Sequence, residues 1–324
     1  MLIVVALGGN ALLRRGETPD ADIQEEHIAR AVQALAPLAR EHDLVVTHGN
    51  GPQVGQLALE SARDPDLSHP FPFDALVAQT QGLIGYWLLQ SLQNALPGRS
   101  VVSLVTQTLV EEDDPAFAAP TKFVGPDYAE DEAQRLAEIW GWSIRPDGGA
   151  WRRVVASPEP RKVVEVDQVR TMVDDGAVVI CAGGGGVPVA QNPEGRIHGV
   201  EAVVDKDLTS SLLARQLHAD ALLLLTDVPA VQLDYGTNRA QSLEHASPEV
   251  LRSYPFAAGS MGPKVEAACR FVEATQKPAA IGRLEDATRL FAGTAGTLVR
   301  RWDVGNQRNE AAPEQHASRT ASTG

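Results

Sequence analysis

The chain has 324 residues, 44% hydrophobic and 22% charged, which is the ordinary balance of a globular protein with one large or two smaller α/β domains. Its formal net charge is −14, which argues against a nucleic-acid partner because such proteins need a net basic face. Cys181 and Cys269 lie in apolar or helical patterns, so we expect small buried residues in a reducing compartment.

Met1 leads directly into the apolar run at residues 2–7, with no basic segment before it and too few apolar residues to span a membrane. We therefore expect a cytoplasmic protein with no membrane partner. The eight histidines show no metal-ligand spacing, so we expect no metal site built by the protein alone.

Short apolar runs alternate with amphipathic helical stretches along the chain. Long helices are predicted over 22–41 and 74–94, where apolar residues return at helical spacing. The apolar runs lack polar–apolar alternation, which indicates strands buried on both faces; they lie at 2–7, 44–47, 101–105, 177–181 and 221–226. The pattern predicts an α/β fold with a mostly parallel central sheet covered by helices.

Residues 113–160 interrupt this alternation and contain one clear helix near 127–138. Three tryptophans in this excursion could give it a small core of its own: Trp140, Trp142 and Trp151. We expect a small subdomain or lid, inserted in a domain that spans residues 1–303. Residues 304–324 are polar and without periodicity, which predicts a disordered tail.

Glycine-rich turns follow three of the predicted strands: Gly8-Gly9-Asn10, Gly49-Asn50-Gly51, and the run from Gly183 and Gly184 to Gly186. In a parallel sheet these turns share the carboxyl edge, where ligands bind. Glycine has no Cβ, so backbone N–H groups of such turns can converge on an anion. Three such turns on one edge predict a phosphate site.

Two common nucleotide-binding motifs are missing from the sequence. No lysine follows a glycine, which excludes a P-loop. No Gly-x-Gly-x-x-Gly follows a strand, and the run at 183–186 continues into an apparent further strand, which disfavours a dinucleotide-binding Rossmann domain.

Lysine is rare in this chain, since only five of the 28 basic residues are lysines and the rest are arginines. Lys162 and Lys277 are interpreted as surface residues, whereas Lys122, Lys206 and Lys264 lie in segments with the composition of catalytic loops. A lysine ammonium is a compact, mobile charge that can follow a moving phosphoryl group better than the planar guanidinium of arginine.

The neighbours of these lysines strengthen the interpretation. Asp207 is predicted to be the cap or a first-turn residue of a helix, next to Lys206, and Pro263 to take the first helical position before Lys264. Lysines and backbone amides at phosphate-binding turns, with no obvious nucleophile or base, favour phosphoryl transfer, which needs mainly positioning and charge neutralisation.

The chain resembles the carbamate kinase family of the amino acid kinase superfamily, from residue 1 to about residue 302. The segments that carry the resemblance are VVALGGNA (4–11), THGNGPQVG (47–55), TQGLIGYW (80–87), PTKFVGP (120–126), WRRVVASP (151–158), CAGGGGVP (181–188), GVEAVVDKD (199–207) and GSMGPKVEA (259–267). The segments around Lys122 and Trp151 distinguish this family from its superfamily relatives better than the glycine turns do.

The resemblance implies a three-layer αβα sandwich, the amino acid kinase fold, with a protruding lid and usually a homodimer. It also implies reversible phosphoryl transfer between carbamoyl phosphate and ADP with Mg, giving ATP and carbamate without a covalent intermediate.

The resemblance further implies roles for individual residues. The transferred phosphoryl group is expected at Gly8, Gly9 and Asn10, and the carbamoyl side at Gly49, Asn50 and Gly51, with Gly183 and Gly184 as further phosphate- or substrate-binding residues. The catalytic residues are expected to be Lys122, Lys206 and Lys264, which neutralise phosphate charge, and Asp207, which organises the lysines. The nucleotide is expected at Thr226, Asp227, Val228, Met261, Gly262 and Lys264.

Two alternatives stay open. A superfamily relative acting on another small acid, such as an amino-acid carboxylate or a phosphonate, would need a roomier pocket beside Asn50 and Gly51 and a cation for a second anion. A nucleotide-sensing module without turnover would not need the four groups of Lys122, Lys206, Asp207 and Lys264.

Overall fold

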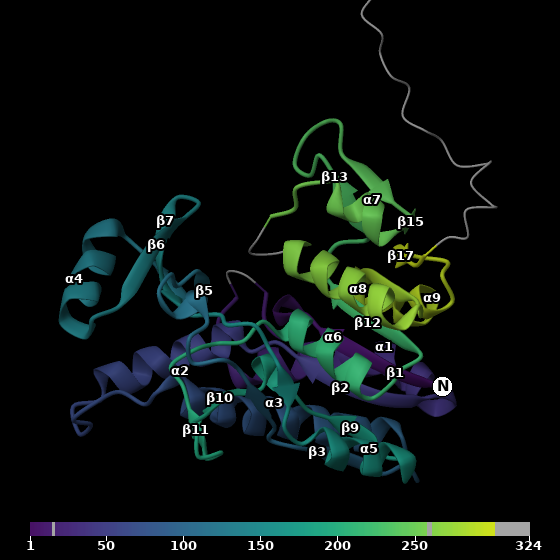
Figure 1. The fold of residues 1–324 in the computed structure, drawn as a ribbon, viewed down its shortest axis with the longest axis horizontal. Helices are drawn as coiled ribbons and strands as arrows, with labels where there is room; N and C mark the ends of the chain where they lie inside the picture. Colours follow the sequence, from purple (N-terminus) through teal and green to yellow (C-terminus); the bar gives the residue numbers. More distant parts are fainter. Residues whose placement is uncertain (15–16, 258–260, 302–324) are drawn as a thin grey trace, which may run out of the picture.

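The computed structural model describes residues 1–14, 17–257 and 261–301. Its centre is an eight-stranded sheet in the order β15-β17-β16-β12-β1-β2-β9-β3 (Figure 1). Its strands are β1 Leu2–Leu7, β2 Asp43–His48, β3 Val101–Ser103, β9 Val178–Ile180, β12 Ala221–Thr226, β15 His245–Ala246, β16 Ala279–Arg283 and β17 Thr297–Val299. Every neighbouring pair is parallel except β16 with β17. The predicted α/β class and the five predicted strands are therefore confirmed, although β3 ends two residues early.

Helices cover both faces of this sheet (Figure 1). The helices are α1 Ala21–Glu41, α2 Gly51–Arg63, α3 Phe73–Ala95, α4 Glu130–Trp140, α5 Val166–Asp174, α6 Lys206–Gln216, α7 Pro248–Arg252, α8 Met261–Thr275 and α9 Ala287–Phe291, with short 3-10 turns η1 Gly9–Ala11, η2 Pro115–Phe117, η3 Gly183–Gly185 and η4 Leu284–Asp286. The two long helices predicted from periodicity correspond to α1 and α3. None of the helices in the described part of the chain is long and apolar enough to cross a membrane.

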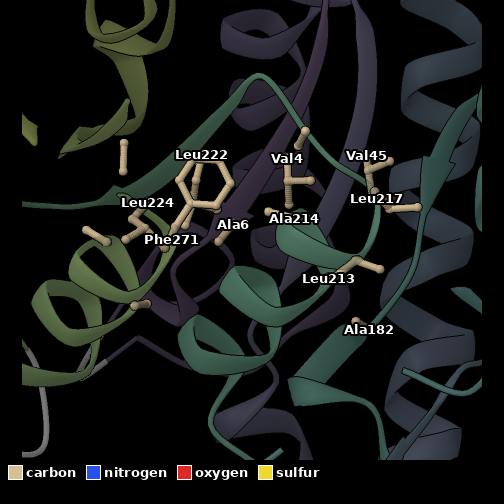
Figure 2. Close-up of a cluster of buried hydrophobic side chains, with 14 of the residues drawn as sticks. Val4, Ala6, Val45, Ala182, Leu213, Ala214, Leu217, Leu222, Leu224 and Phe271 are labelled. Atoms are coloured by element: carbon tan, nitrogen blue, oxygen red, sulfur yellow. The ribbon is translucent and has the colours of Figure 1, made fainter. Parts of the chain in front are cut away.

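Alternate residues of β1 explain the three layers. Ile3 and Val5 face a core built with α1, α3 and α9. Val4 and Ala6 face the opposite core, which includes Phe271 of α8 and two residues of α6 (Figure 2). Because side chains alternate across a strand and both faces are covered, every position of the strand must be apolar.

Three smaller sheets lie outside the central one, in the orders β11-β10-β4-β8, β13-β14 and β5-β7-β6. Their strands are β4 Gln107–Leu109, β5 Lys122–Tyr128, β6 Ser143–Asp147, β7 Ala150–Val155, β8 Lys162–Val163, β10 Val187–Gln191, β11 Ile197–Gly199, β13 Val231–Leu233 and β14 Gln241–Leu243. The strand expected after the glycine run at 183–186 is β10.

Residues 122–155, here called the projecting subdomain, contain β5, α4, β6 and β7 and extend from the body beside α2 (Figure 1). Their small core consists of Tyr128, Ala133 and Leu136, with Trp142 and Trp151 packed against it. The ring of Trp140 contacts that of Trp142, with centroids 5.6 Å apart. The predicted tail at 304–324 lies outside the described residues.

Two predicted helix starts were wrong by a few residues. The helix expected near 127–138 begins at Glu130, because Tyr128 still belongs to β5 and is buried in the small core. Three acidic residues in its first turn favour the later start, since they interact well with the helix dipole. Helix α8 begins at Met261, so Pro263 is its third residue and not its first.

The projecting subdomain contacts α2 through two glycines. A Cβ on Gly55 of α2 would lie 2.1 Å from the backbone N and Cα of Gly125 in β5. Gly125 itself has a φ of +74°, a conformation that residues with a Cβ rarely adopt. The two backbones therefore touch: a side chain on Gly55 would require a shift of Gly125, and one on Gly125 would be strained by its positive φ.

We expect Gly55→Ala to lower the free energy of unfolding by about 1–3 kcal/mol, because the added methyl overpacks this contact. Urea unfolding followed by circular dichroism measures the change. Gly82→Ala is the matched control, since Gly82 lies on an exposed face of α3 with no atom within 4 Å of an added Cβ. There alanine should be neutral or stabilising by up to ~1 kcal/mol. Equal stability of the two variants would contradict the close contact.

Candidate active site

The predicted glycine turns lie next to one another at the carboxyl edge of the central sheet. Strands β12, β1, β2 and β9 are consecutive and parallel, so the segments that follow them share this edge. The turn after β1, at residues 8–10, is in the middle. The turns after β2 and β9, at 49–51 and 183–186, lie on one side of it, and Thr226 at the end of β12 lies on the other. This is the place where open α/β sheets bind ligands.

The turns pack in direct contact. A Cβ on Gly49 would lie 3.0 Å from the backbone N and Cα of Gly9, and one on Gly184 would lie 2.2 Å from the side-chain nitrogen of Asn50. The Asn50 amide donates to the hydroxyl of Thr80 on α3, at 2.8 Å. Glycine is thus required for the close approach of these turns, and the hydrogen bond to Thr80 ties the turn after β2 to α3.

The turn after β9 is held by buried threonines. Thr106 accepts a hydrogen bond from the N–H of Ala182, a non-glycine residue with a φ of 50°. The carbonyl of Gly185 accepts from the hydroxyls of Thr108, at 2.7 Å, and Thr209, at 3.0 Å. These bonds compensate the unusual backbone conformation and fix the turn against α6.

Lys206 and Lys264 share one carboxylate. The Lys206 ammonium lies 2.5 Å from Oδ1 of Asp207, and the Lys264 ammonium lies 3.2 Å from Oδ2 of the same residue. The three side chains are 11%, 13% and 6% exposed, so the group is nearly buried. Lys206 is the first residue of α6, and Lys264 lies in the first turn of α8.

The cap of α6 is Asp205, which sequence analysis did not select. Its Oδ1 accepts hydrogen bonds from the N–H groups of Asp207, at 2.9 Å, and Leu208, at 3.3 Å. Asp207 was predicted to be either the cap or a first-turn residue, and it is the first-turn residue. The other oxygen of Asp205 lies 2.5 Å from the ammonium of Lys122, which joins the projecting subdomain to the body.

These neighbours change the pKa values of three groups, of which the Asp205 and Lys206 side chains are nearly buried and that of Lys122 is about one third exposed. Burial opposes the charged form of Lys122, but the Asp205 carboxylate more than offsets this and raises its pKa. Burial alone would raise the pKa of Asp205, yet Lys122 and Lys206 hold it well below its ordinary value. Burial and the charge of Lys264 lower the pKa of Lys206, although Asp207 opposes them. The ammoniums at this site are thus stabilised by neighbouring carboxylates, and a bound anion could stabilise them as well.

A cleft of about 880 Å³ lies over these groups, between the sheet edge and the projecting subdomain. Of the predicted site residues, those that line it are Gly9, Gly49, Asn50, Gly51, Lys122, Gly184, Lys206, Asp207 and Lys264. Two predicted residues, Gly8 and Gly183, do not line the cleft, and a Cβ on either would point into the protein. A Cβ on Gly8 would meet the carbonyl of Leu225 at 2.9 Å, and one on Gly183 would meet the ring of His48. Asn10 belongs to the same turn, but its side chain is outside the description.

The residues predicted for the nucleotide lie on the β12 side of the central turn and do not line this cleft in the described structure, apart from Lys264. Thr226 ends β12, close to Gly8, and its hydroxyl donates to Asp227, which is exposed beside Val228. Met261 and Gly262 begin α8, where the N–H of Gly262 donates to the carbonyl of Ala257. Lys264 was predicted both as a catalytic residue and as a nucleotide-binding residue, and it lines the cleft.

The described residues do not fit a dedicated magnesium site. They contain no cluster of three or more histidine, cysteine or acidic groups that could hold a metal ion. Asp205 and Asp207, the carboxylates at the lysine end of the cleft, already contact ammoniums through their oxygens. Magnesium that accompanies a nucleotide is commonly held by phosphates with only one or two carboxylates.

Sequence reasoning did not select Asp205 or His48 as site residues. Asp205 carried a usable signal, because an aspartate directly before a helix is a common cap. His48 is fully buried, and its contact with the turn after β9 joins residues far apart in the sequence, so no local pattern identifies it.

Comparison with known proteins gives consistent matches. The model of the amino acid kinase family matches residues 1–283. The carbamate kinase of Rhizobium meliloti (strain 1021) is 50% identical over 303 residues, which covers 92% of this chain and 93% of that protein. The carbamate kinase of Escherichia coli O6:H1 is 48% identical over 297 residues, covering 92% and 98%. A structure of carbamate kinase from Giardia lamblia bound to AMP-PNP is 39% identical, with a TM-score of 0.84, and the match covers 92% and 98%.

The family match over most of the chain agrees with the parallel sheet, its glycine turns and the lysines that converge on them. The chain therefore belongs to the amino acid kinase family as a phosphotransferase enzyme, and it is similar to carbamate kinases over nearly its whole described length.

Proposed function

We propose that this enzyme catalyses the carbamate kinase reaction, in which a phosphoryl group passes reversibly between carbamoyl phosphate and ADP to give carbamate and ATP. The carbamate kinases to which the chain is similar support the substrate pair, and the bound AMP-PNP of the Giardia relative supports a nucleotide. The proposal includes the Mg that would enter with the nucleotide, and the homodimer and cytoplasmic location that the sequence resemblance implies.

The observation that carries the proposal is the group of Lys206, Asp207 and Lys264. Both lysines lie in the first turn of a helix, where a cation opposes the helix dipole at a cost of about 0.3–1 kcal/mol. A bound phosphate reverses this sign, because helix N-termini and ammoniums both attract an anion. With Lys122 and Asp205 included, three ammoniums face two carboxylates, so the site is locally positive in a chain of net charge −14.

The strand order suits transfer along a line across the sheet edge. The carbamoyl side is proposed at the turn after β2, the transferred phosphoryl group at the turn after β1, and the nucleotide at the end of β12. An oxygen of the ADP β-phosphate attacks phosphorus, and the bond from phosphorus to the carbamoyl oxygen breaks to release carbamate. Lys206 and Lys264 neutralise charge on the phosphoryl oxygens during this step, and no side-chain nucleophile is required.

The projecting subdomain is proposed to act as a lid. It is attached to the body at two ends, has its own small core and brings Lys122 to the cleft. Closure would exclude water, which matters because carbamoyl phosphate is an activated anhydride.

A second candidate, a relative acting on a larger acid, is favoured by one observation. Three arginines also line the cleft, namely Arg14, Arg63 and Arg152, and a larger acid would need such a cation for its second anion. Arg152 is already engaged by Asp147, at 2.9 Å, and by the carbonyl of Gly125. This engagement makes Arg152 less suited to bind a second anion, and carbamoyl phosphate, which carries no anionic group outside the phosphate, would need no such cation.

The proposal is tested by a coupled assay for ATP formation from ADP with different phosphoryl donors. We expect rapid turnover with carbamoyl phosphate and much slower turnover with acetyl phosphate at equal concentration. In the reverse direction, phosphorylation of amino-acid carboxylates or phosphonates should be negligible. A preference for one of those acids would replace the proposal with the second candidate, and ADP binding without turnover of any donor would indicate a sensor.

We expect Lys206→Ala to lower kcat by about 100-fold or more, because charge that develops on the phosphoryl group loses one of the two ammoniums proposed to neutralise it. Lys206→Arg should rescue little, since the planar guanidinium cannot occupy the same point between Gly49 and Asp207. Lys162→Ala is the control, because that lysine is exposed on β8. Steady-state kinetics of the three variants decide the matter, and near-normal turnover of Lys206→Arg would refute the specific need for lysine.

A further inference from the structure

His48 is the last residue of β2 and directly precedes the turn that is proposed to hold the carbamoyl side. It is 1% exposed, and its ring lies between two of the glycine turns. One edge of the ring faces its own turn through Nδ1, which lies 3.0 Å from the carbonyl oxygen of Gly49. The other edge faces the turn after β9, where a Cβ on Gly183 would lie 2.3 Å from Nε2.

The contact with Gly49 determines which nitrogen carries the proton. A carbonyl oxygen can only accept a hydrogen bond, so Nδ1 must be the donor. Burial, with a smaller effect of the nearby Lys206 charge, lowers the pKa of His48 to about 4, so the ring is neutral near pH 7 and Nε2 carries no proton.

The hydrogen bond also determines how the next peptide group lies. The peptide that joins Gly49 to Asn50 is trans, as are all peptides in the described residues, so its carbonyl and its N–H point in opposite directions. Because the carbonyl of Gly49 is turned toward the buried ring, the N–H of Asn50 is turned away from the ring. That N–H has no acceptor among the residues whose contacts the structure describes.

The rest of Asn50 is fixed by other bonds. Its side-chain amide donates to Thr80, and its carbonyl accepts from the N–H of Val54 at 2.8 Å. Gly49, Asn50 and Gly51 line the cleft, and a Cβ on Gly51 would meet no atom within 4 Å. The stem of Lys206 lies near Gly49, with its Cδ 3.5 Å from the place of an added Cβ. The turn and Lys206 thus line the same cleft.

We propose that His48 is a positioning residue that holds the Gly49–Asn50 peptide with its N–H directed at the anionic phosphoryl donor in the cleft. This inference rests on the proposed function for the identity of the donor, but the orientation of the peptide does not. The role belongs to Nδ1 alone, because Nε2 faces the turn after β9 and not the carbonyl of Gly49.

Two substitutions separate the two ring nitrogens. The side-chain amide of asparagine can present its N–H near the position of Nδ1, whereas glutamine presents its N–H near that of Nε2. His48→Asn should therefore keep the peptide in place and His48→Gln should release it. We expect His48→Gln to raise KM for carbamoyl phosphate roughly tenfold or more, with the KM for ADP nearly unchanged, because a hydrogen bond to a charged group is lost. His48→Asn should stay within about threefold of the unchanged enzyme.

A measurement without turnover separates this role from the proposed function. Selective ¹⁵N-asparagine labelling allows the backbone amide of Asn50 to be followed during titration with inorganic phosphate. The unchanged enzyme and His48→Asn should show a large, saturable shift, and His48→Gln a much weaker one. If this pattern appears but carbamoyl phosphate is not a substrate, the positioning role stands and the proposed function fails.

Two results would overturn the positioning role. One is equal KM values and equal phosphate responses in all three proteins. The other comes from the unchanged enzyme alone, so that it does not depend on the folding of any variant. Long-range ¹H–¹⁵N spectra of the histidine rings report the tautomer, and a His48 ring protonated at Nε2 instead of Nδ1 would contradict the hydrogen bond on which the inference rests.

Discussion

Two lysine ammoniums share the carboxylate of Asp207 at the centre of the candidate site. Nearly buried charges are stable only when they are paired, because removing one partner leaves an uncompensated charge in a poorly solvated place. Asp207 allows Lys206 and Lys264 to lie close together at the starts of α6 and α8 while the site is empty of substrate charge. When an anion is present the two ammoniums have a second partner, so the same arrangement is suited to bind and release phosphate.

The strand order gives this group its position. Strands β12, β1 and β2 are neighbours, and both faces of the sheet are covered, so the exposed functional groups must come from the turns at one edge. Helices α6 and α8 cover the same face and lie side by side (Figure 1). Their first turns meet at that edge, where Lys264 of α8 pairs with Asp207 of α6. The projecting subdomain adds Lys122, which pairs with Asp205, the cap of α6.

Much of this could be predicted from sequence because the signals are local. Apolar runs without alternation predicted the central strands, the glycine turns predicted the edge, and scarce lysines next to Asp207 or Pro263 predicted the cationic groups. The ends of several elements differed from the predicted ones by a few residues. Tyr128 extended β5 because of its burial in the small core, which no short window shows. The pairing of Lys122 with Asp205, the contact of Gly55 with Gly125 and the ring of His48 between two turns join distant segments, so they appear only in the folded chain.

We propose that the transferred phosphoryl group lies at the turn after β1, between the three lysines. A crystal structure with ADP and a planar phosphoryl mimic such as aluminium fluoride would locate this group. We expect the mimic within hydrogen-bond distance of the Gly9 backbone and of the ammoniums of Lys206 and Lys264, with Lys122 closer to it than in the ligand-free crystal form. A mimic bound elsewhere, or a projecting subdomain that keeps Lys122 away from this turn in both forms, would refute this placement.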